Sequence, residues 1–149
     1  MEVIGHPITL FGAGHQKRGF IPLPDAMQCF ALALENPPEA GEYRVFNQFA
    51  DVFDLTELAT RVQQAAATLS MDAGICQLEN LRQELETHYC NPDHERLVEL
   101  GYRPAQDIDG QLVSMLEDLR PHRTRIANKQ SVLIPDIRWR GKRAKVDWH

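Results

Sequence analysis

The start of the chain places a short apolar run directly before two glycines, and this order constrains the fold more than any other feature. Residues 8–11 read ITLF and are bulky, β-branched or aromatic, which favours a strand. Gly12 and Gly14 follow, and they favour a tight reversal of the chain. Arg18 comes next and carries a planar fork of donors that suits an anion such as a diphosphate. Taken alone, the pattern fits any α/β domain.

The rest of the chain predicts helices and short strands in alternation. Asp54 and Glu57 have capping-box spacing, and Gly101 is placed to end a helix. Alternating side chains favour a strand at 42–47. We therefore expect helices beginning at Asp25, Asp54, Pro92 and Asp109, and strands at 8–11, 42–47 and 75–78. This order predicts the α/β class, with a small three-stranded sheet whose edges need cover.

Apolar residues at helical spacing predict which face of each helix is buried. In the first helix, the predicted buried residues are Met27, Phe30, Ala31 and Leu34. In the second they are Leu55, Leu58, Ala59, Val62, Ala66 and Leu69, and in the last Leu112, Val113, Leu116 and Leu119.

Length and composition indicate one soluble globular domain. The chain has 149 residues, of which 43% are hydrophobic and 25% charged. No apolar run approaches the ~20 residues that a membrane span needs, and the start of the chain lacks the order of a secretory signal. Three cysteines without a close pair favour a reducing compartment. We therefore expect a cytoplasmic protein that does not enter membranes.

Charge divides the chain into an acidic body and a basic tail. Residues 1–119 carry a net charge of −12 and residues 120–149 a net charge of +7. A basic tail with a tryptophan is one way to contact nucleic acid, but a solvated tail that screens an acidic body is the favoured interpretation. We accordingly divide the chain into a body at 1–120 and a basic C-terminal tail at 121–149.

Several common catalytic motifs are absent from the sequence. It has no glycine-rich phosphate loop, no nucleophile elbow and no tyrosine followed four residues later by lysine. His88, Cys90 and His94 do not match a zinc spacing, so no metal site is predicted. No residue of this chain is assigned a catalytic role.

A second arginine and a tyrosine follow the strand predicted at 75–78. The guanidinium of Arg82 is able to share an anion with Arg18, and the Tyr89 hydroxyl is able to add a neutral hydrogen bond. The alternative is a surface ion pair between Arg82 and Glu84 or Glu86, worth ~0–1 kcal/mol. Spacing alone leaves both interpretations open.

Four stretches together resemble a known family. They are HPITLFGAGHQKRGF, EYRVFNQF, NLRQELETHY and NKQSVLIPDIRW, and the resemblance runs from about Val3 to Arg140. It is to the C-terminal half of the extended short-chain dehydrogenase/reductases that act on sugar nucleotides, the NAD-dependent epimerase/dehydratase family. The glycine after the arginine, the RVFNQF stretch and the IPDIRW stretch point toward the sulfolipid branch of that family.

The resemblance implies roles for individual residues in binding a UDP-sugar. It implies that Thr9, Leu10 and Phe11 lie along the nucleotide base. It further implies that Arg18 and Arg82 bind the diphosphate and that Tyr89 also binds it. NAD is implied for the intact enzyme, bound mainly by an N-terminal Rossmann half that carries the glycine-rich loop and the tyrosine–lysine pair, and this chain contains neither.

The leading hypothesis is therefore the substrate-binding half of an NAD-dependent enzyme that forms a sulfonated sugar nucleotide from UDP-glucose and sulfite. We expect a truncated protein, a split-gene product or an isolated domain that is inactive alone and needs the missing half as its partner. Homo-oligomerisation stays open. The alternatives are part of another sugar-nucleotide epimerase or dehydratase, and a non-enzymatic α/β binding module.

Overall fold

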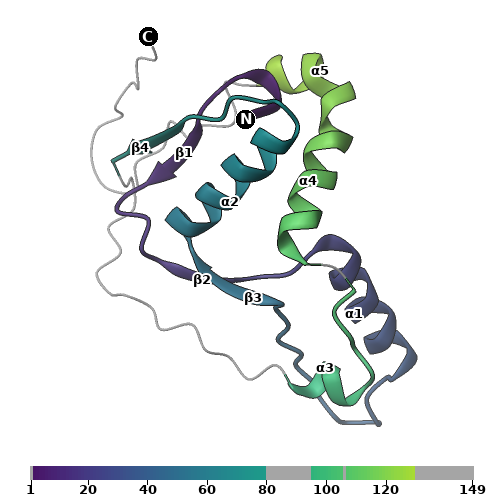
Figure 1. Ribbon diagram of the computed structural model, residues 1–149. Coiled ribbons are helices and arrows are strands. Elements are labelled where there is room, and N and C mark those ends of the chain that lie inside the picture. The colour runs from purple at the N-terminus through teal and green to yellow at the C-terminus, as the bar shows by residue number, and fades with distance from the viewer. Residues whose placement is uncertain (1, 80–94, 106, 130–149) are drawn as a thin grey trace.

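The computed structural model describes residues 2–79, 95–105 and 107–129, and Figure 1 shows the path of the chain. Strands and helices alternate, as the sequence predicts, so the structure belongs to the mixed α/β class. In chain order the elements are η1 (Glu2–Ile4), β1 (Ile8–Phe11), β2 (Lys17–Phe20), α1 (Leu23–Glu35), β3 (Asp51–Asp54), α2 (Leu55–Thr68), β4 (Ile75–Leu78), α3 (Glu95–Glu99), α4 (Ile108–Leu119), η2 (Arg120–His122) and α5 (Arg123–Ala127). Within these ranges no helix has the length and apolar character of a membrane span.

The described strands form two separate pairs. β1 and β4 are parallel, with Ile8 opposite Ile75 and Phe11 opposite Leu78. β2 and β3 are antiparallel, with Lys17 opposite Asp54. The predicted strands at 8–11 and 75–78 are confirmed. β2 and β3 were not predicted, because KRGF and DVFD show little apolar alternation.

The predicted strand at 42–47 is wrong for this chain. Residues 42–49 form no regular secondary structure, and among the described residues they pair with no strand. Tyr43 is 88% exposed, and the Arg44 guanidinium binds the Glu42 carboxylate instead, with a distance of 2.8 Å from Nε to Oε1. A strand needs a neighbour for its backbone groups, and alternation alone does not supply one.

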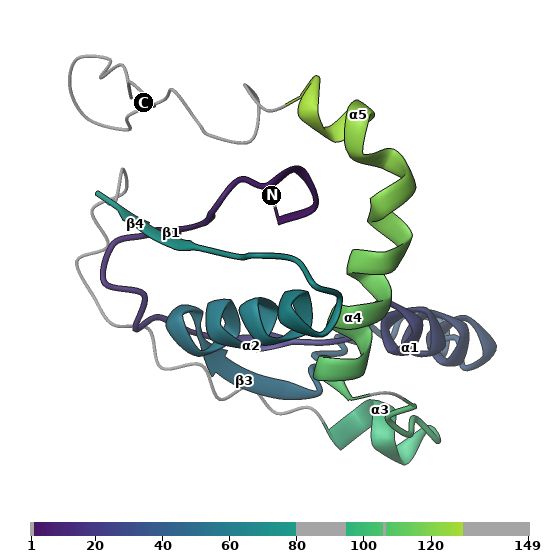
Figure 2. The same ribbon diagram turned by 45° about the horizontal axis from the view of Figure 1, so that its top comes forward.

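The main apolar cluster joins α2 to α4, and Figure 2 shows the two helices crossing beside the β1–β4 pair. Ala65 and Ala66 of α2 pack with Leu112 and Leu116 of α4, and all four are buried. Val62, Leu69, Val113 and Leu119 pack at its margin. The predicted faces of these two helices are therefore confirmed at the residues of this cluster other than Ala65, which was not predicted to be buried.

A second cluster packs α1 against α3 and the segment after it. Cys29, Leu97 and Tyr102 are buried there, with Leu32 and Phe46 at the margin. The predicted buried face of α1 is wrong: Met27 is 58% exposed, Phe30 66% and Leu34 81%, and Ala31 is exposed as well. α1 turns its Cys29 side inward because that side meets Leu97 and Tyr102, which are far away in sequence.

α1 does not begin at Asp25, contrary to the prediction, and Asp25 does not cap it. The helix begins at Leu23, two residues earlier, because Pro22 and Pro24 have a fixed φ that suits a first turn. The Asp25 carboxylate is fully buried instead. By contrast, the predicted cap at Asp54 is confirmed: its Oδ1 accepts a hydrogen bond from the Glu57 amide at 2.7 Å.

The beginning of the predicted basic tail is helical in the structure. They form η2 and the short helix α5, which follow α4 almost directly. Pro121 stands in the first turn of η2, where proline is tolerated. The predicted helix from Pro92 to Leu100 is present at Glu95–Glu99, and Gly101, with φ +105°, follows it. Pro92 lies outside the described residues.

Candidate functional site

The candidate site lies at the carboxyl ends of β1 and β4, where the chain turns at Gly12 and Gly14. In α/β proteins the carboxyl ends of parallel strands are the usual place for a ligand. Gly12 and Gly14 have φ of +73° and +78°, so the predicted reversal is confirmed. The Gly12 amide donates to Leu78 O at 2.8 Å, and the Gln77 side-chain amide donates to Gly12 O at 2.7 Å. The turn is thus held at the end of β4.

The register of β1 with β4 decides which backbone N–H and C=O groups of β1 are not used in pairing with β4. The Ile8 amide donates to Gly74 O and the Gly12 amide to Leu78 O, so alternate residues of β1 face β4. Thr9 and Phe11 therefore direct their backbone N–H and C=O groups toward the opposite edge, where no described strand lies. Leu10 faces β4, and its side chain is buried. Of the three residues predicted to lie along a base, only Thr9 and Phe11 offer backbone donors and acceptors at the open edge.

Gly14 fits closely against the start of α2. A Cβ at this position would collide with the Thr56 hydroxyl oxygen, and the Gly14 carbonyl accepts hydrogen bonds from the amides of Leu55 and Thr56. The Asp54 side chain takes the next amide, that of Glu57. Because the first amides of α2 are already bonded, this helix end is not free to bind a phosphate.

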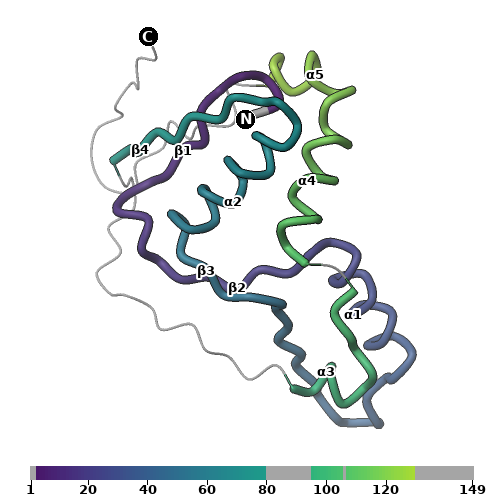
Figure 3. The backbone as a smooth tube through the Cα atoms, viewed as in Figure 1, coloured from purple at the N-terminus to yellow at the C-terminus, as the bar shows by residue number. Residues whose placement is uncertain are grey.

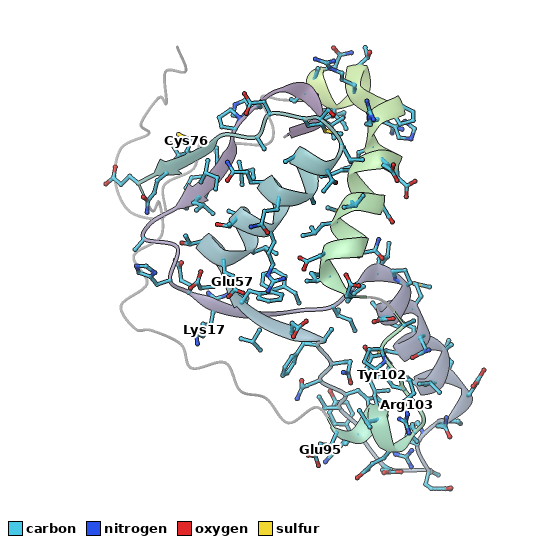
Figure 4. The ribbon with its side chains drawn as sticks, viewed as in Figure 1. Lys17, Glu57, Cys76, Glu95, Tyr102 and Arg103 are labelled. Carbon is cyan, nitrogen blue, oxygen red and sulfur yellow. The ribbon has the colours of Figure 1, made fainter. Side chains whose placement is uncertain are left out.

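Arg18 lies on β2, directly opposite Phe53 of β3. Its side chain is half-buried, and its Nη1 donates to Lys17 O at 2.9 Å. The neighbouring Lys17 is exposed, and Figure 4 shows it on the outer side of β2, away from α2. Gly19 follows, and a Cβ there would be 3.0 Å from Phe49 Cβ. A glycine after Arg18 thus allows residue 49 to pass close to β2.

The other two predicted site residues, Arg82 and Tyr89, lie outside the described residues. The structure therefore tests neither the convergence of Arg82 with Arg18 nor the alternative ion pair of Arg82 with Glu84 or Glu86. His88, Cys90 and His94 also lie in that range. In the part of the chain that is described, no group of three or more histidine, cysteine, aspartate or glutamate side chains is placed to hold a metal ion.

One polar network beside the site was not predicted from the sequence. Arg61 of α2 stacks over the Phe53 ring, with its Cζ 4.5 Å from the ring centroid. Its Nη1 binds the Asp109 carboxylate at 2.8 Å, and its Nη2 binds Glu57 at 3.2 Å, the residue labelled on α2 in Figure 4. The hydrogen bond to Asp109, followed by that to Glu57, raises the pKa of Arg61. Only the spacing of Glu57 and Arg61 on one helix face was visible in the sequence.

A second unpredicted feature is the buried group around Asp25. The Tyr102 hydroxyl donates to Asp25 Oδ2 at 3.4 Å, and the Ala105 amide donates to Asp25 Oδ1 at 3.0 Å. Burial, reinforced by the Asp25 charge, raises the pKa of Tyr102 to about 12, and burial also raises the pKa of the Cys29 thiol. The network joins α1 to the segment between α3 and α4, so it holds the fold together away from the β1 turn.

A cavity of about 460 Å³ lies at the other end of the molecule from α3. Its lining comes from η1, the end of α2 and the η2–α5 region, and includes Ser70, Asp72, Arg120 and Arg123. Ser70 has φ +57°, where a left-handed residue ends α2. Of the predicted site residues that the structure describes, none lines this cavity.

Comparison with known proteins gives a match over nearly the whole chain. UDP-sulfoquinovose synthase of Sulfolobus acidocaldarius is 41% identical over 138 residues, which are 93% of this chain and 35% of that protein. The chain is similar to part of a UDP-sulfoquinovose synthase. The chloroplastic UDP-sulfoquinovose synthase of Spinacia oleracea is 37% identical over 92% of this chain and 28% of its own length. The predicted resemblance is confirmed, and the chain spans about a third of the length of these relatives. No family model matches the chain.

Solved structures share the fold of this chain over part of their length. UDP-glucose 4-epimerase of Thermotoga maritima, determined with UDP-glucose, has a TM-score of 0.65 at 20% identity and covers 81% of this chain and 37% of its own. The dTDP-glucose 4,6-dehydratase of Streptomyces venezuelae, determined with NAD, has a TM-score of 0.62 at 21% identity, over 81% of this chain and 36% of its own. The α/β fold is thus that of part of the epimerase/dehydratase enzymes, as the sequence predicted.

Proposed function

We propose that this chain is the sugar-nucleotide-binding portion, the C-terminal part, of an NAD-dependent enzyme that converts UDP-glucose and sulfite into UDP-sulfoquinovose. The observation that carries the proposal is the 41% identity to a UDP-sulfoquinovose synthase across 93% of the chain. The fold supports a sugar-nucleotide ligand, because a structural neighbour at TM-score 0.65 was determined with UDP-glucose. The binding role belongs to the body at 1–120, and the basic tail at 121–149 is a separate segment of the same chain.

The proposed binding mode follows the groups at the carboxyl end of β1. The backbone of Thr9 and Phe11 is open to the hydrogen-bonding edge of the uracil base, while Leu10 supports the strand from the core. The guanidinium of Arg18 holds the diphosphate together with Arg82, which follows β4 by four residues. The Tyr89 hydroxyl adds a neutral hydrogen bond to the same group.

NAD does not fit the residues that this chain provides. A dinucleotide needs a glycine-rich loop before a helix whose first amides are free, and the sequence has no such loop. At α2 the first amides are bonded to Gly14 O and to Asp54. We therefore assign NAD and the hydride-transfer residues to a companion nucleotide-binding part, present in the same polypeptide or in another. In the absence of that part, this chain has no oxidoreductase activity.

Titration with UDP-glucose tests the proposed site. The chain is combined with the residues of the Sulfolobus acidocaldarius relative that it does not match, and the affinity for UDP-glucose is measured by calorimetry. Arg18→Ala and Arg82→Ala are each expected to weaken binding at least about tenfold, because hydrogen bonds to charged groups are worth about 1.5–3 kcal/mol. Lys17→Ala is the matched control, since it removes a neighbouring positive charge on the outer side of β2. Equal affinities for all four proteins would contradict the assignment.

A different sugar-nucleotide epimerase or dehydratase is the second candidate, because the fold is shared with enzymes of both kinds. The products formed from UDP-glucose by the combined protein separate the two. Formation of a sulfonated sugar nucleotide only when sulfite is present supports the first candidate. A 4-epimer or a 4-keto-6-deoxy product that forms without sulfite supports the second.

A further inference from the structure

The β2–β3 pair directs alternate side chains to its two sides. Lys17 points to the outer side, away from α2, as Figure 4 shows. Arg18 and Phe53 are directly opposite each other in the register, so their side chains share the inner side, with Cβ atoms about 4.5–5.5 Å apart. Phe53 is buried there and Arg18 is half-buried. The side chain proposed to bind the diphosphate therefore stands beside an aromatic ring.

The Phe53 ring is itself held by side chains from two helices. Arg61 of α2 lies over the ring, with its Cζ 4.5 Å from the centroid. The Arg61 Nη1 lies 3.0 and 2.8 Å from the two carboxylate oxygens of Asp109 on α4, and its Nη2 lies 3.2 Å from Glu57 Oε1. Figures 1 and 3 show why these groups meet: β3 leads directly into α2, and α4 runs beside that helix.

These contacts leave Phe53 few other positions. The planar guanidinium of Arg61 presents its donors in a rigid geometry, so hydrogen bonds to two carboxylates fix its place over the ring. The Phe20 ring of β2, with its centroid 6.1 Å away, bounds Phe53 from the neighbouring strand. Arg18, by contrast, is a long side chain that loses rotamer freedom when it binds an anion. A fixed ring beside its aliphatic stem removes part of that freedom before the ligand arrives.

We propose that Phe53 and Arg61 are positioning residues for the diphosphate site, and that together they hold the Arg18 guanidinium in the orientation that binds a diphosphate. The inference rests on the proposed function and adds two residues to its site, both of which act through Arg18. Glu57 and Asp109 act one step further away, through Arg61. Their carboxylates also offset the charge of Arg61, so the positive charge presented to an anion on this side of β2 is that of Arg18.

A purely structural role for the same network predicts a different pattern of effects. Arg61 joins α2 to α4 whether or not Arg18 is present, so the loss of this joint alone would lower the melting temperature and weaken the binding of every ligand of the site. A positioning role acts only through Arg18, and only on ligands that carry a diphosphate. UDP and uridine separate the two roles, because they share the base and the ribose and differ in the diphosphate.

Calorimetry on the combined protein described above measures the affinities for UDP and for uridine, at a temperature well below the melting temperature of every variant. Phe53→Leu and Arg61→Leu should each weaken UDP binding about fivefold, equivalent to about 1 kcal/mol, and should change uridine binding by less than about twofold. Phe53→Leu leaves every charge in place, so a lost positive charge cannot explain its effect. Asp109→Asn alters an exposed carboxylate without disturbing the core, and it should weaken UDP binding by a smaller factor, about threefold.

Arg103→Leu is the matched control, because Arg103 also donates hydrogen bonds within the chain, and Figure 4 shows it near α3, far from Glu57. It should leave both affinities unchanged. In an Arg18→Ala background, Arg61→Leu should cause no further loss of UDP binding, since the two residues act as one unit.

Three results would overturn the inference while leaving the role of Arg18 intact. They are a fall in uridine binding as large as that in UDP binding, parental UDP binding by Phe53→Leu and Arg61→Leu, and an undiminished effect of Arg61→Leu in the Arg18→Ala background. Failure of Arg18→Ala itself to weaken UDP binding would refute the proposed binding mode, and the inference with it. The single variant Arg18→Ala thus distinguishes failure of the proposed function from failure of the inference alone.

Discussion

The hydroxyl of Tyr102 donates a long hydrogen bond to the Asp25 carboxylate, at 3.4 Å, across 77 positions of sequence. Both residues are almost completely buried, and Asp25 also accepts from the Ala105 amide at 3.0 Å. This pair holds α1 against the segment between α3 and α4. It therefore fixes which face of α1 is covered by the described part of the chain.

Substituting Tyr102 and substituting Asp25 should each lower the free energy of unfolding, but by different amounts. Tyr102→Phe should cost about 1 kcal/mol, the value of an ordinary hydrogen bond, whereas Asp25→Ala should cost about 2–3 kcal/mol because it leaves the Ala105 amide without its partner. Urea denaturation measures both. Tyr43→Phe serves as the control, and because Tyr43 is exposed its change should stay within about 0.5 kcal/mol. Equal effects for all three variants would exclude a stabilising role for the pair.

The raised pKa of Tyr102 predicts a loss of stability at high pH. Its pKa is 10.0 in an ordinary setting and about 12 in the folded chain. Between these two pH values the unfolded chain has released the proton and the folded chain retains it, so the free energy of unfolding falls as pH rises. Below pH 10 the contribution is fully present. Denaturation series from pH 9 to 12 should show this fall, and Tyr102→Phe should remove the part that belongs to this residue.

Gly14 should tolerate substitution poorly for two separable reasons. Its φ of +78° is strained for any other residue, and a Cβ would collide with the Thr56 hydroxyl. Gly41 has a similar φ of +84° but open space around it. Gly41→Ala should therefore cost about 1 kcal/mol from backbone strain alone, and Gly14→Ala clearly more. Thermal unfolding of the two variants compares them directly, and Thr56→Ala should recover part of the loss in Gly14→Ala alone.

Two helix caps should contribute similar and independent amounts to stability. Asp54 accepts from the Glu57 amide at 2.7 Å at the start of α2, and Asp107 accepts from the Gly110 amide at 2.6 Å at the start of α4. Each change to alanine should lower the free energy of unfolding by about 1 kcal/mol. Since the two caps share no hydrogen-bond partner, the double variant should show the sum within about 0.5 kcal/mol. A markedly larger loss in the double variant would mean that the two helix ends depend on each other.

The candidate site could be predicted in part from the sequence. The apolar run and the two glycines are local features, and the strand and turn that they predicted are confirmed. The anion-binding role of Arg18 stays a prediction. The sequence did not show that the backbone N–H and C=O groups of Thr9 and Phe11 point away from β4, whereas those of Leu10 point toward it. That depends on the register with β4, a strand more than 60 positions away, because pairing decides the direction of each backbone group.

Local chemistry in the sequence by itself determined the strands at 8–11 and 75–78, the cap at Asp54, the glycine turn and the stripes of α2 and α4. Only the tertiary structure decided that α1 buries Cys29 and exposes Met27 and Phe30, and that Asp25 joins Tyr102 inside the fold. It also decided that residues 42–47 pair with no strand among the described residues. The physical reason is the same in each case. Periodicity states which residues share a face, but a face is buried, and a strand is paired, only where another part of the protein supplies the opposing surface.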